Sequence, residues 1–393
     1  MKDSALAHKK WGDLSCMTHD SCVTRALMVS TSFPATRKDW PGRFIANLAE
    51  ALARRTDVEL ALWAPPGEHS AEIVDVASPG DAEWLRHLLE TGGIAHLLRA
   101  SPVRGWMAAA GLLRRLRRVY RRHRDVDVLH VNWLQNALPL WGVDKPAVIS
   151  VLGNDFGLLR VPGMIAALRA MLRGRRAIIA PNADWMAKDL TRWFGDLAEI
   201  RPIPFGVDDP WFSVDRQLAA DDPQRWLAVT RLTRRKVGDL FDWGEGLFDD
   251  QRQLHLFGPM QEALNVPDWV QYHGPTHPSA LLEDWFPIAT GFVTLSRHDE
   301  GRPQVLLEAM AATLPVVASR LPAHTDLILS GETGVLVDSR IAFEKALKDL
   351  EYPAVNQGIG LASRDWIKSN VGTWDDCAAR YHVAYQSVLG TGS

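Results

Sequence analysis

Apolar positions along the chain gather in short runs that alternate with stretches of helical periodicity. A first series of strand-like runs begins near residues 26, 58, 127, 147 and 177, and a second series begins near 226, 253, 269, 291, 315 and 335. Short apolar strands separated by helices are typical of a parallel sheet that is buried on both faces. Because the pattern occurs twice, the sequence predicts an α/β chain of two Rossmann-like, doubly wound domains.

The two series also suggest where the domains begin and end. Residues 1–24 precede the first strand and are expected to form a flexible extension, and residues 25–210 form the first domain. A stretch rich in Pro and Asp, residues 211–224, is interpreted as a linker to a second domain at 225–370. Parallel sheets bind ligands at the carboxyl ends of their strands, so the two domains are expected to face a cleft.

Composition narrows the class of protein. The 393 residues are 47% hydrophobic and 23% charged, as in an ordinary globular enzyme. Cys16, Cys22 and Cys377 are too few and too scattered for a disulfide framework or a cysteine zinc site. No apolar run reaches the roughly 18–20 residues of a membrane span, and the first residues lack the apolar centre of a signal peptide. A cytoplasmic location is therefore expected.

Charge is divided unevenly between the halves. Residues 1–212 hold 28 Lys and Arg against 23 Asp and Glu, a net charge of +5, whereas the remainder holds 16 against 24, a net charge of −8. The first half is therefore expected to favour an anionic partner.

Much of this positive charge lies in the arginine-rich segment 111–124, which has helical periodicity. One face is apolar, and seven arginines lie mostly on the other faces. Such a face is either simply solvated or in contact with anionic lipid or a pyrophosphate-linked acceptor, and the basic stretch at 169–177 favours the second interpretation. No nucleic-acid-binding motif accompanies the arginines, so nucleic acid is not an expected partner.

A carboxylate in an otherwise apolar segment, "DEGRPQVLLEAMAATLPVVAS" at 299–319, is the strongest chemical signal. The pattern predicts a helix at about 303–313 that is packed on most sides, with Glu308 in or beside a core. A buried carboxylate needs a partner, which is either an arginine of a neighbouring element or a ligand. The helix start at 302–304 offers free N–H groups for phosphate, about 7.5 Å along the axis from Glu308, and Glu300 precedes it. A nucleoside diphosphate sugar matches this layout.

The segment "EGRPQVLLEAMAATLPVVAS" resembles the E-x7-E segment of the retaining glycosyltransferases of family 4, which have the two-domain GT-B fold. Four further stretches are similar to that family: "TRLTRRKVGD" at 230–239, "PIPFGVD" at 202–208, "SGETGVLVDS" at 330–339 and "TWDDCAARYHVAYQSVL" at 373–389. The last resembles the closing helix of the fold, which implies that residues 371–393 cross back to the first domain.

The resemblance implies a donor site in the second domain. Glu308 would bind the ribose hydroxyls, Glu300 the donor hexose, and Arg231 and Lys236 the diphosphate. These cations would stabilise charge that grows as the anomeric bond breaks, so Glu300, Arg231 and Lys236 are the expected catalytic residues, and neither metal nor cofactor is expected. The remaining donor contacts would come from the helix start and from a glycine loop after the first strand: Gly301, Arg302, Pro303, Gln304, Val305 and Gly42.

The acceptor side is expected at the strand ends of the first domain. In "VLGNDFG" at 151–157, Leu152 stands where the family usually has histidine, and Gly153 and Asp155 follow. Asp155 either lines the acceptor pocket or caps the following helix. His130, Asn132 and Trp133 end another strand, where they contact the acceptor or serve loop packing.

Together these features predict a retaining, metal-independent glycosyltransferase. It would move a hexose from a UDP- or GDP-sugar to a lipid-linked or polysaccharide acceptor of the cell envelope, at the inner face of the membrane. Two alternatives stay open: a catalytically inactive partner subunit that binds nucleotide sugar, which Leu152 and the single Gly42 favour, and a GT-B nucleotide-sugar epimerase.

Overall fold

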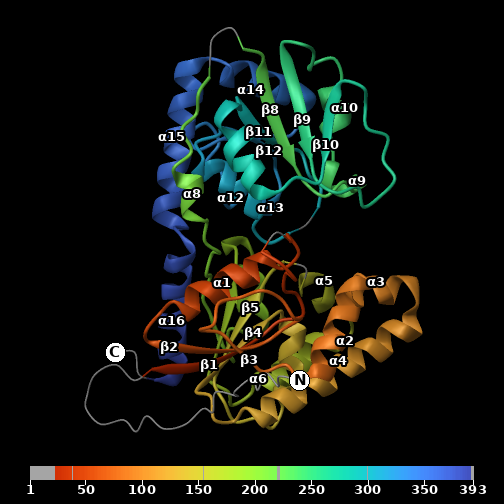
Figure 1. Ribbon diagram of the computed structural model, residues 1–393, viewed down its shortest axis with the longest axis vertical. Helices are drawn as coiled ribbons and strands as arrows, with labels where there is room; N and C mark the ends of the chain where they lie inside the picture. The colour runs from red at the N-terminus through yellow and green to blue at the C-terminus, as the bar shows by residue number, and fades with distance from the viewer. Residues whose placement is uncertain (1–22, 38, 154, 219–221, 299, 391–393) are drawn as a thin grey trace, which may run out of the picture.

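The computed structural model describes residues 23–37, 39–153, 155–218, 222–298 and 300–390, and Figure 1 shows that they form two α/β domains, one above the other. The expected flexible extension lies outside the described residues, except for Val23 and Thr24. Thr24 already belongs to the first strand.

The first domain is built on a parallel sheet with the order β3-β2-β1-β4-β5-β6-β7. The sequence predicted five of its strands. It did not predict β3 and β7, because each has only two residues, too few to show a periodicity. The strands are β1 (Thr24–Val29), β2 (Val58–Trp63), β3 (Val74–Asp75), β4 (Val128–Asn132), β5 (Ala147–Val151), β6 (Ala177–Pro181) and β7 (Glu199–Ile200).

The second sheet is also parallel, with the order β10-β9-β8-β11-β12-β13, and all six of its strands were predicted. The change of direction in the strand order next to β8 and β11 is typical of a doubly wound sheet. The strands are β8 (Gln224–Val229), β9 (Arg252–Phe257), β10 (Val270–Gly274), β11 (Gly291–Thr294), β12 (Val316–Ser319) and β13 (Val335–Val337).

Helices cover both faces of each sheet. Those of the first domain are α1 (Arg43–Ala53), α2 (Pro79–Glu90), α3 (Gly93–Ala100), α4 (Pro102–Arg122), η1 (Leu134–Leu140), α5 (Asp155–Leu159), α6 (Met164–Leu172), η2 (Asp184–Met186) and α7 (Ala187–Phe194). Those that follow are α8 (Asp209–Phe212), α9 (Arg234–Val237), α10 (Leu240–Gly244), α11 (Pro278–Ala280), η3 (Leu281–Trp285), η4 (Phe286–Ile288), α12 (Gln304–Ala311), α13 (Pro322–Thr325), α14 (Arg340–Leu350), α15 (Pro353–Asn370) and α16 (Trp374–Leu389). No helix within the described ranges is both long and apolar enough to cross a membrane.

The last two helices connect the domains. In Figure 1, α15 runs beside the second sheet and α16 continues along the first. The tyrosines of α16, Tyr381 and Tyr385, are fully buried in the core formed by α1 and the first sheet. The helix therefore closes one face of the first domain with residues from the end of the chain.

In the segment predicted as a linker, 211–224, two of the described residues pack against the second domain. Trp211 is 3% exposed and lies in the core that contains α12. Arg216 donates hydrogen bonds to the carbonyl oxygens of Ala289, Thr290 and Thr313. Pro and Asp mark turns in a sequence, but they do not show whether an intervening Trp is buried.

Candidate functional site

Glu308 lies on α12, where the sequence placed it, and faces the first domain. Burial raises the pKa of its carboxyl to about 8, and the nearby Asp208 raises it further, while Arg43 lowers it. Among the described residues no hydrogen bond or ion pair reaches this carboxylate, so the arginine partner considered from the sequence is absent there. A largely buried carboxyl without a protein partner is suited to accept hydrogen bonds from a ligand.

The second predicted carboxylate, Glu300, is paired. Its Oε2 lies 2.5 Å from Nζ of Lys236, and the two side chains are 20% and 12% exposed. Lys236 is carried by the short helix α9, which the Thr233 side chain caps by accepting from Lys236 N. Gly238 has φ 59°, and a Cβ at this position would overlap the carbonyl of Leu295, so glycine lets the turn approach the end of β11.

Two histidines near this pair were not predicted. Burial lowers the pKa of His298; Lys236 and Arg231 lower it further, and Glu300 raises it, which places all four groups in one electrostatic cluster. His324 is fully buried, and its Nε2 has no hydrogen-bond partner in the described part of the chain. His298 adjoins the predicted motif and could have been found from it, whereas His324 is sixteen residues beyond Glu308 and gave no signal.

The phosphate site predicted at the start of α12 is free of side-chain caps. The helix runs over Gln304–Ala311, shorter than the predicted 303–313, with Pro303 in the extended N-cap position. The Gln304 side chain donates to the carbonyl of Gly206 at 2.8 Å, so it links the helix to the segment that connects the domains. The first backbone N–H groups, those of Gln304 and Val305, are left for a ligand.

Gly42 lies where the first domain approaches Glu308. It precedes α1 with φ 78°, and a Cβ would lie 2.7 Å from the Phe33 nitrogen, so the turn requires glycine. The next residue, Arg43, donates to the Arg37 carbonyl and also contributes positive potential at Glu308. The glycine loop and the donor carboxylate are thus brought close together, although 266 positions separate them.

Asp208, which the sequence did not single out as a site residue, is a second carboxylate near Glu308. Burial raises its pKa, while Arg43 lowers it. Both of its oxygens lie 3.4 Å from Nδ2 of Asn47 on α1. Its position in "PIPFGVD" was a usable signal, because the resemblance covered that segment.

Two of the predicted acceptor contacts, His130 and Asn132, have side chains that are buried in the first domain. His130 is fully buried under α16, with Nδ1 2.6 Å from the Tyr385 hydroxyl and Nε2 2.9 Å from Ser150 Oγ. Burial lowers its pKa to about 3, so it is neutral. Asn132 is also fully buried and donates to the Val29 carbonyl. The alternation of a strand decides which side faces the core, and at this strand both side chains point inward.

Asp155 has a structural role rather than the predicted contact with an acceptor. Its side chain is 1% exposed and accepts from the backbone N–H groups of Leu134 at 2.9 Å and Leu152 at 3.2 Å. Burial raises its pKa to about 6. It therefore connects the segments that follow β4 and β5.

Gly153 lies where the two domains meet, and Trp133 is partly buried against the core of the first domain. A Cβ on Gly153 (φ 93°) would overlap the backbone of Gly301, and a Cβ on Gly301 would overlap Asn182 Oδ1. Trp133 has φ 69°, unusual for a residue with a side chain, and lies edge-on to Phe44 at 6.4 Å. Backbone strain of this kind is concentrated at functional sites.

Arg302 is one of the donor contacts expected at the helix start, and its side chain is already paired within the protein. It is 4% exposed and its Nη2 lies 2.5 Å from Asp326 Oδ2. The backbone of Arg302 still lies beside the start of α12, so a donor contact there would come from the main chain.

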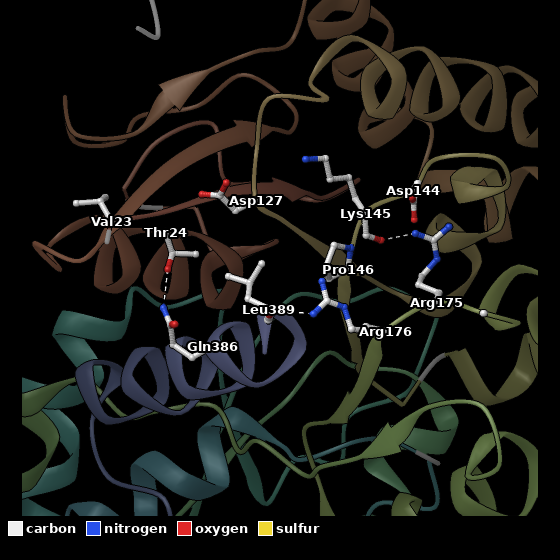
Figure 2. Close-up of a pocket in the computed structure, with 11 residues that line it drawn as sticks. Val23, Thr24, Asp127, Asp144, Lys145, Pro146, Arg175, Arg176, Gln386 and Leu389 are labelled. Carbon is white, nitrogen blue, oxygen red and sulfur yellow. Dashed lines mark hydrogen bonds between the residues drawn. The ribbon is translucent and has the colours of Figure 1, made fainter. Parts of the chain in front are cut away.

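A cavity of about 480 Å³ lies elsewhere, at the amino ends of the first sheet (Figure 2). It is lined by Thr24 at the start of β1, by Lys145 and by Arg176, whose guanidinium donates to the Leu389 carbonyl. Parallel sheets bind substrates at the opposite, carboxyl ends of their strands, so this cavity is not the candidate site.

Two family models match the chain. The one described as Glycosyltransferase Family 4 matches residues 41–210, and the one described as Glycosyl transferases group 1 matches residues 234–351. The chain is 23% identical over 402 residues to a GDP-mannose-dependent alpha-(1-6)-phosphatidylinositol monomannoside mannosyltransferase of Mycobacterium tuberculosis, covering 91% of this chain and 97% of that protein. It is 24% identical over 270 residues to a D-inositol 3-phosphate glycosyltransferase of Paenarthrobacter aurescens, covering 59% and 66%.

Solved structures agree on the fold. A sucrose-phosphate synthase from Thermosynechococcus elongatus superposes with a TM-score of 0.66 at 19% identity, covering 93% of this chain and 99% of that one. An alpha,alpha-trehalose 6-phosphate synthase from Burkholderia multivorans gives 0.68 at 13% identity, with 94% and 97% covered. With both family models matched in the expected order and the GT-B fold present, the chain belongs to the family 4 glycosyltransferases and is a transferase that uses a nucleotide sugar.

Proposed function

We propose that this protein transfers a hexose from a nucleoside diphosphate sugar to a lipid-linked or polysaccharide acceptor of the cell envelope, with retention of anomeric configuration and without a metal ion. The observation that carries the proposal is the Glu308 carboxyl, largely buried and without a partner among the described residues, beside the uncapped start of α12. A ribose would supply the missing hydrogen bonds, and a diphosphate would occupy the helix start.

The cations near Glu300 support the chemistry of this transfer. Negative charge grows on the diphosphate as the anomeric bond breaks, and fixed positive groups stabilise that charge more in the transition state than in the ground state. Lys236 is held by Glu300, and Arg231, half-buried beside it, has no ion pair in the described part of the chain. These two side chains and the helix start are the groups that would take the place of a metal.

GDP-mannose is the donor that we would test first. Curated relatives from Mycobacterium tuberculosis and Mycolicibacterium smegmatis are named as GDP-mannose-dependent, at 23% and 24% identity. The same names make phosphatidylinositol monomannoside the first acceptor to test.

A lipid-linked acceptor is consistent with the surface of the first domain. The hairpin of α3 and α4 lies at the side of this domain in Figure 1, and residues 93–122 contain no Asp or Glu. Trp106 and Met107 near the start of α4 are 64% and 70% exposed. An exposed aromatic beside unpaired arginines favours contact with an anionic membrane, so we propose a peripheral location at the cytoplasmic face.

The test is a transfer assay with the purified full chain, GDP-mannose and phosphatidylinositol monomannoside in detergent micelles containing EDTA. We expect an α-linked mannosylated lipid, identified by nuclear magnetic resonance, and release of GDP that depends on the acceptor. A β-linked product would contradict retention, and loss of turnover in EDTA would contradict metal independence. Conversion of the donor without acceptor would instead indicate the epimerase alternative.

A further inference from the structure

We propose that Asp326 is a positioning residue that holds the first domain against the loop of Glu300, an inference that rests on the proposed glycosyl transfer. Asp326 directly follows α13, a helix on the side of the second domain that faces the first domain (Figure 1). Its two carboxylate oxygens accept hydrogen bonds from the backbone N–H groups of Asp184 and Trp185, each at 3.0 Å. Both donors belong to the first domain.

The two N–H groups belong to a helix that does not supply its own cap. The helical segment η2 and α7 begins at Asp184, and the residue before it, Ala183, has no side-chain oxygen to accept from the first turn. The first N–H groups of a helix have no partner within the helix, and a carboxylate near them also interacts favourably with the helix dipole. Asp326 therefore caps in trans a helix of the other domain.

Arg302 fixes the capping carboxylate in place. Its Nη2 lies 2.5 Å from Asp326 Oδ2, and the two side chains are only 4% and 8% exposed. Burying a carboxylate is costly unless its oxygens are hydrogen-bonded, and the N–H groups of the first domain satisfy both Asp326 oxygens. Separation of the domains would break both of these bonds.

Trp185 makes a second connection to the same loop. Its Nε1 donates to the carbonyl of Gly301 at 3.1 Å, and its ring lies 5.3 Å from that of Phe156 in the first domain. Gly301 stands between Glu300 and Arg302 in the chain. We call Asp326, Arg302 and Trp185 the interdomain clasp, because together they bind the loop of Glu300 to the first domain.

The position of the clasp predicts its effect on the reaction. Glu300 is at the sugar end of the donor site, whereas the nucleotide groups, Glu308 and the start of α12, lie on the second domain alone. Loss of the clasp should leave nucleotide binding in place and let the sugar end move relative to the acceptor side. Reacting groups that lose their alignment slow the chemical step, so kcat should fall without a matching loss of donor affinity.

The experiment compares Asp326→Ala and Trp185→Phe with the wild-type full chain in three measurements. These are the radius of gyration by small-angle X-ray scattering without substrate, GDP affinity by calorimetry, and kcat for mannosyl transfer from GDP-mannose. We expect Asp326→Ala to increase the radius of gyration, to keep GDP affinity within about threefold, and to lower kcat by tenfold or more. Trp185→Phe keeps an aromatic ring but loses the Nε1–H donor to Gly301, and it should lower kcat less. Asp338→Ala, which removes an exposed carboxylate of the same domain, is the matched control.

Unchanged scattering and unchanged kcat in Asp326→Ala would overturn the proposal. A fall in GDP affinity as large as the fall in kcat would also overturn it, because Asp326 would then only support the fold of the donor domain. If Asp326→Ala does not fold, a wild-type kcat in Trp185→Phe counts against the clasp. If the wild-type protein does not use GDP-mannose, the proposed function fails, whereas the scattering comparison still tests the clasp by itself.

Discussion

At the scale of single residues, Glu308 and Glu300 belong to one motif but have different surroundings. Both are glutamates eight positions apart, yet Glu300 is neutralised by Lys236 and Glu308 has no partner in the described chain. The difference follows from position: Glu300 precedes α12 on the side of the α9 cation, and Glu308 lies one turn and a half along the helix, facing the first domain. The unpaired carboxylate is the one expected to respond to a ligand.

Replacing Glu308 by alanine should weaken GDP binding by more than tenfold, about 1.4 kcal/mol, because the ribose hydroxyls lose their acceptor. Isothermal titration calorimetry with GDP measures this directly. Glu344→Ala, on the exposed helix α14, is the matched control and should bind as the wild type does. Equal affinities in wild type and Glu308→Ala would remove the role assigned to Glu308.

The raised pKa of Glu308 predicts how stability depends on pH. Burial raises this pKa from 4.5 to about 8, so the folded protein holds a proton that the unfolded chain releases near pH 4.5. The stabilisation that this proton gives is complete below about pH 4.5 and is lost as pH rises toward 8. Glu308→Gln is neutral throughout, so its melting temperature relative to wild type should be higher at pH 8.5 than at pH 5. Calorimetric melts at both values check this, and a constant difference would contradict it.

At the scale of elements, α4 combines a packed face with a face that has no partner in the described structure. Leu112, Leu116 and Tyr120 are buried against the first sheet, as the apolar spacing predicted. Two arginines are used within the fold: Arg115 pairs with Asp81 and Arg117 donates to the Trp141 carbonyl. Three of the remaining arginines of the helix are spaced three or four residues apart and form one exposed stripe: Arg114, Arg118 and Arg121.

If this stripe binds anionic lipid, replacing Arg114, Arg118 and Arg121 by glutamine should reduce binding to vesicles of phosphatidylglycerol and phosphatidylcholine at low salt. Each cation near such a surface contributes about 1 kcal/mol, so the loss should exceed tenfold and shrink as salt is added. Vesicle co-sedimentation measures it. The control replaces Lys345, Lys348 and Lys368 of the second domain by glutamine, which removes the same charge from another surface. Equal binding of both triple variants would contradict the assignment to α4.

At the scale of the whole molecule, the chain crosses between the domains twice, and the two crossings are bonded to each other. Val207 N donates to the Gly372 carbonyl at 3.0 Å, and Val207 and Thr373 form an isolated parallel bridge. A Cβ on Gly206 would overlap the Thr373 backbone, so the approach requires glycine. The link from Gln304 to Gly206 then connects the start of the donor helix to this crossing.

The donor would contact groups of the second domain and the Gly42 turn of the first domain. Its binding should therefore stabilise the two domains together. A ligand that binds only the folded state at 100 times its Kd adds about 2.7 kcal/mol to the unfolding free energy. A thermal-shift panel of GDP-, UDP- and ADP-sugars should therefore raise the Tm most for the natural donor, with GDP-mannose expected first. A panel in which no nucleotide sugar shifts the Tm would contradict the donor assignment.

The sequence by itself determined the order of strands and helices and singled out the motif that contains Glu300 and Glu308, because both are patterns of residues that are close together in the chain. The parallel strands follow from runs of apolar residues, and Glu308 was conspicuous because a carboxylate interrupts such a run. Two short strands, Val74–Asp75 and Glu199–Ile200, were missed because they contain too few positions for a pattern.

Only the tertiary structure decided which polar residues are available to a ligand. His130 and Asn132 look like Trp133 in the sequence, but both are fully buried. α16, which begins 244 residues after His130, covers His130, and Asn132 donates to the Val29 carbonyl. Arg302 looks like a phosphate ligand in the sequence, but in the structure its guanidinium is paired with the carboxylates of Asp326 and Asp184. Burial and hydrogen bonding are set by elements distant in the chain, so the fold and the motif could be read from the sequence, whereas the partners of each side chain could not.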